Sequence, residues 1–177
     1  MLIYGAGGHG RVVYDVMKRL GLNCEGFFDD SSNADLYGLE HYGAYNKNRY
    51  QNSELIIALG DNNLRAIISE CVSHNFATLI DPSAVVANTA KVDKGTVVLH
   101  RAVVQAEVQI GKHVIINSSA VVDHDCSVGD FSHIAPNATL CGEVTVGKHC
   151  LIGAGAVVLP GAIVEDHTIV RAGSVVR

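Results

Sequence analysis

A histidine between two aspartates is the strongest candidate in this sequence for proton-transfer chemistry. His124 lies in the segment VDHDC, and Asp125 follows it directly. An imidazole titrates near neutral pH, so it can accept a proton from an attacking group, and an adjacent carboxylate can orient the ring and stabilise its charged form. The alternative is a solvated turn histidine without a chemical role, and composition alone does not separate the two.

A glycine-rich segment near the N-terminus is typical of phosphate binding. Gly5, Gly7 and Gly10 match the pattern G-x-G-x-x-G, and Asp29 and Asp30 follow about 20 residues later. Free N–H groups at a helix N-terminus favour a diphosphate. The α/β part of the chain is too short for both halves of an NAD site, so we expect a nucleotide diphosphate sugar. A dinucleotide-dependent enzyme and a ligand-free glycine turn are the alternatives.

The other histidines and the cysteines predict no metal site. The two closest of the nine histidines are His124 and His133, nine residues apart, and the five cysteines contain no C-x-x-C pair. Zinc sites draw their ligands from tighter clusters. We therefore expect no metal, and we expect reduced cysteines that pack as small apolar side chains.

The second half of the chain repeats every six residues. From Ile80 to Val176, every sixth residue is aliphatic without interruption. Such a period indicates a short strand and a turn in each repeat, and stacked repeats must bury the apolar face that a single repeat cannot. Four side chains at the fourth position of the repeat are rings, and they are expected to form one stacked face: His113, Phe131, His149 and His167.

The first part of the chain has the pattern of a small α/β domain. Expected strands cover residues 2–4, 26–28, 55–59 and 77–80, and a helix follows the first and the third. The first helix is expected to bury Val12, Val13, Val16, Met17 and Leu20. The second is expected to bury Leu64, Ile67, Ile68, Cys71 and Val72. This order predicts a doubly wound domain over residues 1–79, with the repeat domain over residues 80–177.

Charge and hydropathy exclude several other classes of protein. The net charge is −5 without a basic run, which argues against nucleic acid or an anionic membrane surface as a partner. No apolar run approaches the roughly 20 residues that a bilayer requires, and glycines occupy the place of a signal peptide's apolar stretch. We therefore expect a cytoplasmic protein.

Taken together, the motifs resemble bacterial sugar acetyltransferases of the sialic acid O-acetyltransferase and UDP-N-acetylbacillosamine N-acetyltransferase type. The resemblance covers nearly the whole chain and includes the segments YGAGGHG, FDD, ALGDN with Arg65, NSS, HDC and GDFSH. It implies a small Rossmann-like α/β domain followed by an all-β left-handed parallel β-helix. Three hexapeptide repeats would form one coil, so residues 18 apart would lie one above the other.

The resemblance also implies roles for individual residues. His124 would be the general base, oriented by Asp125, and the N–H of Gly142, one coil further, would stabilise the oxyanion. The expected substrate contacts are Gly8, His9 and Gly10 for the diphosphate, Asp29 and Asp30 for the uridine, and Gly60, Asn62, Asn117 and His133 elsewhere in the site. The expected acetyl-CoA contacts are Gly142, Gly153, Ala154 and Gly173.

The activity that the resemblance implies is N-acetylation of a UDP-linked 4-amino-deoxy sugar by direct transfer from acetyl-CoA. The protein would be a homotrimer with active sites between neighbouring subunits. No acyl-enzyme is expected, since no cysteine or serine is paired with His124. The alternatives are an O-acetyltransferase of a sialic-acid-like sugar and a catalytically silent β-helix that binds nucleotide sugars.

Overall fold

Three short parallel strands form the sheet of the N-terminal region. In a computed structural model that describes residues 1–177, β1 (Leu2–Tyr4) lies between β2 (Gly26–Phe28) and β3 (Leu55–Ile57). All side chains of these strands are buried, as expected of a parallel sheet that is covered on both faces. Helix α1 (Gly8–Arg19) packs on one face, and the end of α2 (Asn62–Cys71) reaches the other.

The fourth strand expected in this sheet belongs to the second region instead. After β3 and α2, a single bridge joins Leu55 to Phe76. The chain then leaves the sheet, and β4 (Leu79–Ile80) pairs in parallel with β7 (Val97–Val98) of the repeat region. The sheet therefore has three strands, and the boundary expected between residues 79 and 80 falls inside β4.

Helix α2 buries only part of the apolar face that was expected. Leu64 is 54% exposed, Ile67 is 57% exposed and Cys71 is also exposed, whereas Ile68 and Val72 pack against the sheet and Arg65 is completely buried. The prediction was wrong at the three exposed positions, because α2 meets the sheet through its end and the repeat region through its first turn, and these side chains face neither contact. In α1 the expected face is buried at three positions, Val13, Val16 and Met17.

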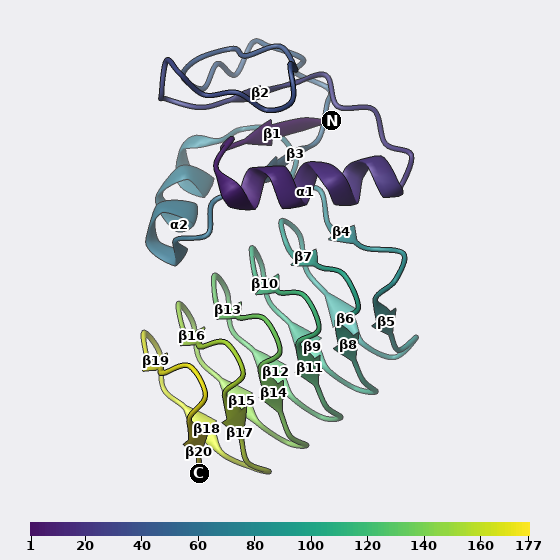
Figure 1. Ribbon diagram of the computed structural model, residues 1–177, viewed down its shortest axis with the longest axis vertical. Helices are drawn as coiled ribbons and strands as arrows, with labels where there is room; N and C mark the ends of the chain where they lie inside the picture. Colours follow the sequence, from purple (N-terminus) through teal and green to yellow (C-terminus); the bar gives the residue numbers. More distant parts are fainter.

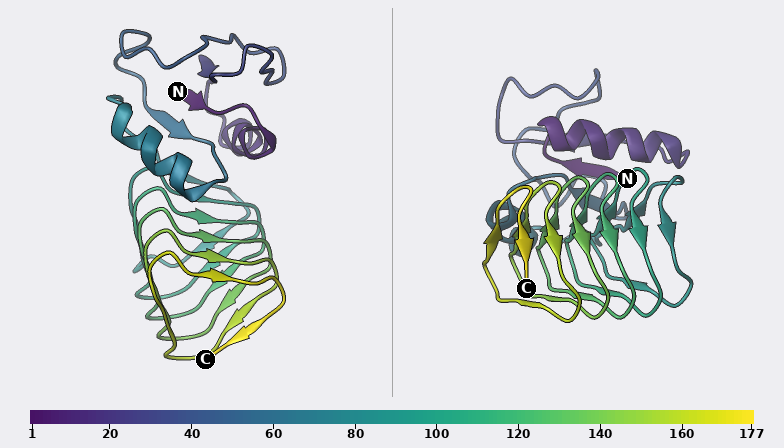
Figure 2. Two further views of the ribbon diagram at one scale, coloured as in Figure 1. Left: turned by 90° about the vertical axis from the view of Figure 1, so that its left-hand side faces the viewer. Right: turned by 60° about the horizontal axis from the view of Figure 1, so that its bottom comes forward.

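The repeat region is a left-handed parallel β-helix of triangular coils, as predicted (Figures 1 and 2). Paired residues are 18 apart, for example Ile115 and His133, so three repeats complete one coil. The first face holds β4, β7, β10, β13, β16 and β19, the second β5, β8, β11, β14, β17 and β20, and the third β6, β9, β12, β15 and β18. The remaining bounds are β5 (Val85–Val86), β6 (Lys91–Val92), β8 (Val103–Val104), β9 (Gln109–Ile110), β10 (Ile115–Ile116), β11 (Val121–Val122), β12 (Ser127–Val128), β13 (His133–Ile134), β14 (Thr139–Leu140), β15 (Thr145–Val146), β16 (Leu151–Ile152), β17 (Val157–Val158), β18 (Ile163–Val164), β19 (Ile169–Val170) and β20 (Val175–Val176).

The corners of the coils repeat one backbone conformation. From Gly95 to Gly173, every sixth residue has a positive φ, and ten of these residues are not glycine. That conformation is uncommon for residues with a side chain, so something must hold it. Most of these residues donate their N–H to a carbonyl of the preceding coil, as Asp125 does to Ala106 over 3.0 Å, whereas Arg101 and Glu107 donate to the hydroxyls of Ser83 and Thr89.

One corner carries the predicted stack of rings. His113, Phe131, His149 and His167 follow one another at ring-centre distances of 4.8 to 5.1 Å. The N-terminal region lies on the first face, where Val97 and Ile115 join the core of Ile3 and Val13 (Figure 1). Neither helix combines the length and the hydrophobicity needed to span a bilayer.

Candidate functional site

His124 presents a free ring nitrogen at the corner between the second and third faces. It lies in the turn between β11 and β12, where its side chain is 53% exposed. Its Nδ1 lies 2.8 Å from Asp125 Oδ2, and because a carboxylate only accepts, Nδ1 donates and Nε2 keeps a lone pair. The hydrogen bond with Asp125 and then the charge of Asp123 raise the pKa of His124. The side chain has the orientation of a base.

Gly142 lies one coil below His124 and leaves room for its ring. A Cβ atom at this glycine would lie 2.6 Å from Nε2 of His124, so any side chain would displace the imidazole. The Gly142 N–H donates to no other atom of the chain. Both residues border an open hollow of about 430 Å³, together with Asp123, Cys141, Glu143, Pro160 and Gly161.

A second cluster of predicted site residues lies under the N-terminal region, on the first face. Asn117 Nδ2 donates to Nε2 of His133 over 2.9 Å, which leaves Nδ1 of His133 as a donor. His9 lies in the first turn of α1, close enough to His133 for the two rings to repel each other when both are protonated. The buried Nε2 of His9 has no hydrogen-bond partner. Burial first, and then nearby positive charge, lowers the pKa of both histidines to about 4. Both rings are therefore neutral at physiological pH.

The glycine loop before α1 has the geometry of an anion site. Gly5 has φ +102°, and a Cβ on Gly10 would lie 2.3 Å from the Gly5 carbonyl oxygen, so the loop folds tightly on itself. The N–H groups of Gly8, His9 and Gly10 donate to no atom of the chain, and the first turn of α1 contains no acidic residue. These three N–H groups are free to bind an anion.

The two predicted uridine-binding aspartates differ in their surroundings. Asp29 accepts from the backbone N–H of Ala6 over 2.8 Å and from that of Ser31 over 2.9 Å, so both carboxylate oxygens hold loops in place. Asp30 is exposed and accepts only from the Tyr4 hydroxyl, over 3.2 Å. A hollow of about 170 Å³ lies beside them, lined by Tyr4, Asp29, Asp30, Leu59, Leu64 and Ile68. Asp30 thus has the freer carboxylate.

Asn62 is occupied by contacts within the protein. Its Nδ2 donates to the carbonyls of His149 and Cys150, over 3.2 and 3.0 Å, and its Oδ1 accepts from Arg65 over 2.8 Å. The contacts that Asn62 and Arg65 make with the repeat region were not predicted from the sequence. The only signal was an arginine among the apolar residues of a helix. Gly60 and Asn62 border a hollow of about 370 Å³ with Asp61, Asn63, His133, His149, Leu151, His167 and Ile169.

The predicted acetyl-CoA contacts lie on two different corners. Gly153, Ala154 and Gly173 follow strands β16 and β19, at the corner between the first and second faces. A Cβ on Gly153 would lie 2.5 Å from the Ala172 nitrogen, so this glycine also allows close packing of coils. Gly142 lies with His124 on the next corner.

One chain therefore does not bring all predicted site residues together. His124 and Gly142 occupy the vertex opposite the first face, whereas the glycine loop and His133 lie on that face. The hollow beside His124 and the hollow beside His133 share no residue. Within one chain, the predicted base and the predicted sugar contact His133 therefore lie at separate places on the β-helix.

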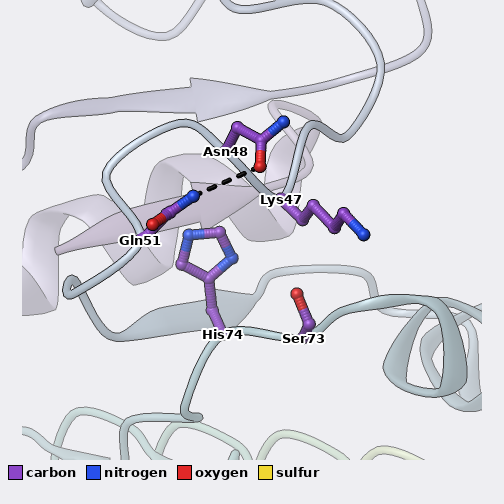
Figure 3. A pocket seen from close by; sticks show the side chains of 5 residues that line it. All are labelled: Lys47, Asn48, Gln51, Ser73 and His74. Carbon is purple, nitrogen blue, oxygen red and sulfur yellow. Dashed lines mark hydrogen bonds between the residues drawn. The ribbon is translucent and has the colours of Figure 1, made fainter.

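A further polar hollow lies away from both clusters (Figure 3). It holds about 300 Å³ and is lined by Lys47, Asn48, Gln51, Ser73 and His74. Both ring nitrogens of His74 are engaged, with the Tyr45 hydroxyl over 2.7 Å and the Arg49 carbonyl over 2.9 Å. Neither nitrogen of His74 is therefore free to act as a base.

Comparisons with known proteins find relatives of both regions of the chain. Residues 1–72 match the family described as PglD N-terminal domain, and residues 107–142 and 143–177 match bacterial transferase hexapeptide repeats. The acetyltransferase domain of PglB from Neisseria gonorrhoeae is 33% identical over 99% of this chain and 90% of that chain, with a TM-score of 0.92. PerB from Caulobacter crescentus, in complex with CoA and GDP-perosamine, is 34% identical over 99% and 87%, with a TM-score of 0.94.

Two other similarities are more limited. WeeI from Acinetobacter baumannii is 21% identical with a TM-score of 0.64, over 99% of this chain and 95% of that chain, and shares the fold. An uncharacterized protein of Acanthamoeba polyphaga mimivirus is 32% identical over 109 residues, which are 60% of this chain and 22% of that protein. The chain thus spans about a fifth of the length of that viral relative.

Proposed function

The chain belongs to the hexapeptide-repeat sugar acetyltransferases, and from this premise we propose that it transfers the acetyl group of acetyl-CoA to the amine of a UDP-linked 4-amino-deoxy sugar. Two relatives support the cosubstrate and the substrate class, since the PglB domain has been solved with acetyl coenzyme A and PerB with CoA and GDP-perosamine. The feature that carries the proposal is His124, an exposed base hydrogen-bonded to Asp125 and packed against Gly142.

The proposed reaction is a direct transfer. Nε2 of His124 removes a proton from the sugar amine while the amine nitrogen attacks the thioester carbonyl. The Gly142 N–H stabilises the tetrahedral oxyanion. The C–S bond then breaks, the amide forms, and the departing CoA thiolate takes the proton from the imidazolium, which returns His124 to its neutral form.

We further propose that residues 1–79 hold the nucleotide sugar and that residues 80–177 carry the chemistry. The free N–H groups of Gly8, His9 and Gly10 would bind the diphosphate, and Asp30 would bind the base. Asn117 and the neutral His133 would contact the sugar. An uncharged imidazole can donate to a sugar hydroxyl, and it does not repel the amine of the substrate when that amine is protonated.

The active form that we propose is a homotrimer with its sites between subunits. The separation of His124 from His133 supports it, and so does the outer surface of the second face. That surface is a column of β-branched side chains, Val85, Val103, Val121, Thr139, Val157 and Val175, of which the first and last are more than 60% exposed. An uncovered apolar column of this kind is typical of a subunit interface.

A panel of nucleotide sugars tests the substrate. We expect the release of free CoA thiol with UDP-linked 4-amino sugars, and weaker release with GDP-linked ones or with 4-hydroxy analogues. Turnover of hydroxyl acceptors alone would support the O-acetyltransferase. Tight binding of UDP-sugars without CoA release would support the silent β-helix. Stronger binding of NAD(H) than of UDP-sugars would contradict the proposal that the substrate is a UDP-sugar.

A further inference from the structure

Arg65 is a buried cation without an ionic partner. Its side chain is 0% exposed and forms no salt bridge, although burial lowers its pKa only to about 10, so it stays charged at neutral pH. Instead it donates to the carbonyls of Leu59 and His113 over 2.8 Å each, and to that of Phe131 over 2.8 Å. Removing a charge from water has a high free-energy cost. An apolar side chain at this position would therefore stabilise a purely structural contact better than an arginine does.

The contacts of Arg65 and Asn62 join the N-terminal region to three successive coils. Arg65 reaches the corners at His113 and Phe131, and Asn62 reaches the next corner at His149 and Cys150. The two side chains are also bonded to each other over 2.8 Å. We call this set of contacts the arginine latch. A lysine cannot replace it, because Arg65 makes five hydrogen bonds from three separate nitrogens, whereas a lysine ammonium has three donors on one nitrogen.

The latch lies between the two halves of the proposed substrate site. On one side, Arg65 fixes the loop at Leu59 and Gly60, and Leu59 borders both the hollow beside Asp30 and the glycine turn at Gly5. On the other side, it fixes the Phe131 carbonyl, two residues before His133. The latch thus spans the path from the nucleotide to the sugar.

We propose that Arg65, together with Asn62, is a positioning residue that fixes the nucleotide-binding loops relative to His133, so that the nucleotide and the sugar of one substrate are held at the correct separation. This inference rests on the proposed function. It assigns Asn62 to positioning, and not to the direct substrate contact that was expected from the sequence.

A second contact between the same two regions provides a matched control. At the far end of α1, Arg19 Nε donates to the buried carboxylate of Asp81 over 2.7 Å. This ion pair also ties the N-terminal region to the first coil, but neither residue borders the hollows of the proposed site. Its loss should weaken the fold without moving the sugar relative to the nucleotide.

The experiment compares Arg65→Lys, Asn62→Ala and Arg19→Gln in the full chain. For each variant, steady-state kinetics give kcat and both KM values, calorimetry gives the affinity for free UDP, and thermal unfolding gives Tm. We expect Arg65→Lys and Asn62→Ala to lower kcat/KM for the nucleotide sugar by about 10- to 100-fold, since small misplacements at a reacting centre have effects of this size. Their KM for acetyl-CoA and their affinity for free UDP should stay near wild type, because neither ligand bridges the latch.

The control separates positioning from loss of stability. Arg19→Gln should lower Tm and leave both KM values near wild type. Wild-type kinetics in Asn62→Ala and Arg65→Lys would overturn the inference. So would an equal loss in Arg19→Gln, or a parallel rise of both KM values, since these results indicate a purely structural role. A wild-type protein that binds UDP-sugars but releases no CoA would contradict the proposed function itself.

Discussion

At the residue scale, the pKa of His124 links the structure to a rate. The hydrogen bond with Asp125 and then the charge of Asp123 raise this pKa above its ordinary value of 6.5. A base acts only when it is deprotonated, so kcat should rise with pH through a pKa above 6.5. We expect Asp125→Asn to shift this limb to lower pH and to lower the plateau, because the imidazole becomes a weaker base. The pH profile of kcat measures both changes.

The matched variant for that profile is His124→Ala. It should remove the limb and lower kcat by about 10²–10⁴, with little change in either KM, because the lost interaction exists mainly in the transition state. Tm should barely change, since His124 is half exposed in a turn. A His124→Ala protein with wild-type turnover would show that His124 is not the base of the reaction.

Gly142 offers an independent test of the same geometry. In Gly142→Ala the new methyl would lie 2.6 Å from Cε1 and Nε2 of His124, and its three nearest atoms all belong to that ring, so the ring must move away. We expect kcat to fall by about 10²-fold with the fold intact, because a displaced base no longer meets the acceptor. Kinetics and circular dichroism together give the answer, and unchanged kcat would show that the position of the ring is not critical. Gly155→Ala is no control, because its φ of +66° would strain the backbone.

Some of these residue contacts could be predicted from the sequence, and others could not. The six-residue spacing, together with the three-repeat coil that the family resemblance implied, placed Gly142 directly on His124, because 18 residues separate them. The bonds from Asp29 to Ala6 and Ser31 were not predictable in this way, since they depend on the path of loops that follow no period.

At the scale of elements, α2 shows where periodicity fails. Its apolar residues recur at helical spacing, which predicted a buried face at Leu64 and Ile67, yet these are exposed and Arg65 is buried. Hydrophobic periodicity assumes that the helix is covered along its length, whereas α2 meets the sheet only through Ile68 and Val72 and leaves Leu64 and Ile67 uncovered. The strands of the solenoid were predictable because every repeat has the same neighbours above and below.

The loop after β2 gives a prediction about nucleotide binding. Asp29→Ala should lower both UDP affinity and stability, because it removes two hydrogen bonds that hold the glycine loop and the following turn. Asp30→Ala should weaken UDP binding by about 1.5–3 kcal/mol, the usual contribution of a hydrogen bond to a charged group, without a change in Tm. Calorimetry and thermal unfolding of the two variants separate these effects. Equal losses of affinity and stability in both would mean that Asp30 is also a structural residue.

At the scale of the whole molecule, complementation between inactive subunits tests the shared site. If His124 of one subunit acts with His133 of its neighbour, a trimer that mixes His124→Ala and His133→Ala subunits contains one intact site. For random mixing in equal amounts, about three quarters of the trimers are mixed, so we expect about one quarter of the wild-type activity at low sugar concentration. Each variant alone should be nearly inactive in the same assay.

Two further measurements serve as controls for the complementation experiment. Light scattering should give about three times 18.8 kDa for wild type, and Val157→Asp, on the outer column of the second face, should give a folded monomer without activity. Activity of the mixture no greater than the mean of the two variants would mean that each site belongs to one chain. A monomeric wild type at micromolar concentration would exclude the shared site altogether.

The strict 18-residue period makes the solenoid a modular structure in which each whole coil is one unit. Removal or addition of 18 residues keeps every later residue on its own face, whereas 6 or 12 residues move it to another face, and a number that is not a multiple of six places a corner where a strand must run. Within one chain, Asn117, His124, His133 and Gly142 fall inside two consecutive coils. The coils beyond them can therefore be gained or lost, in steps of about 4.8 Å along the axis, while the arrangement of these four residues is inherited unchanged.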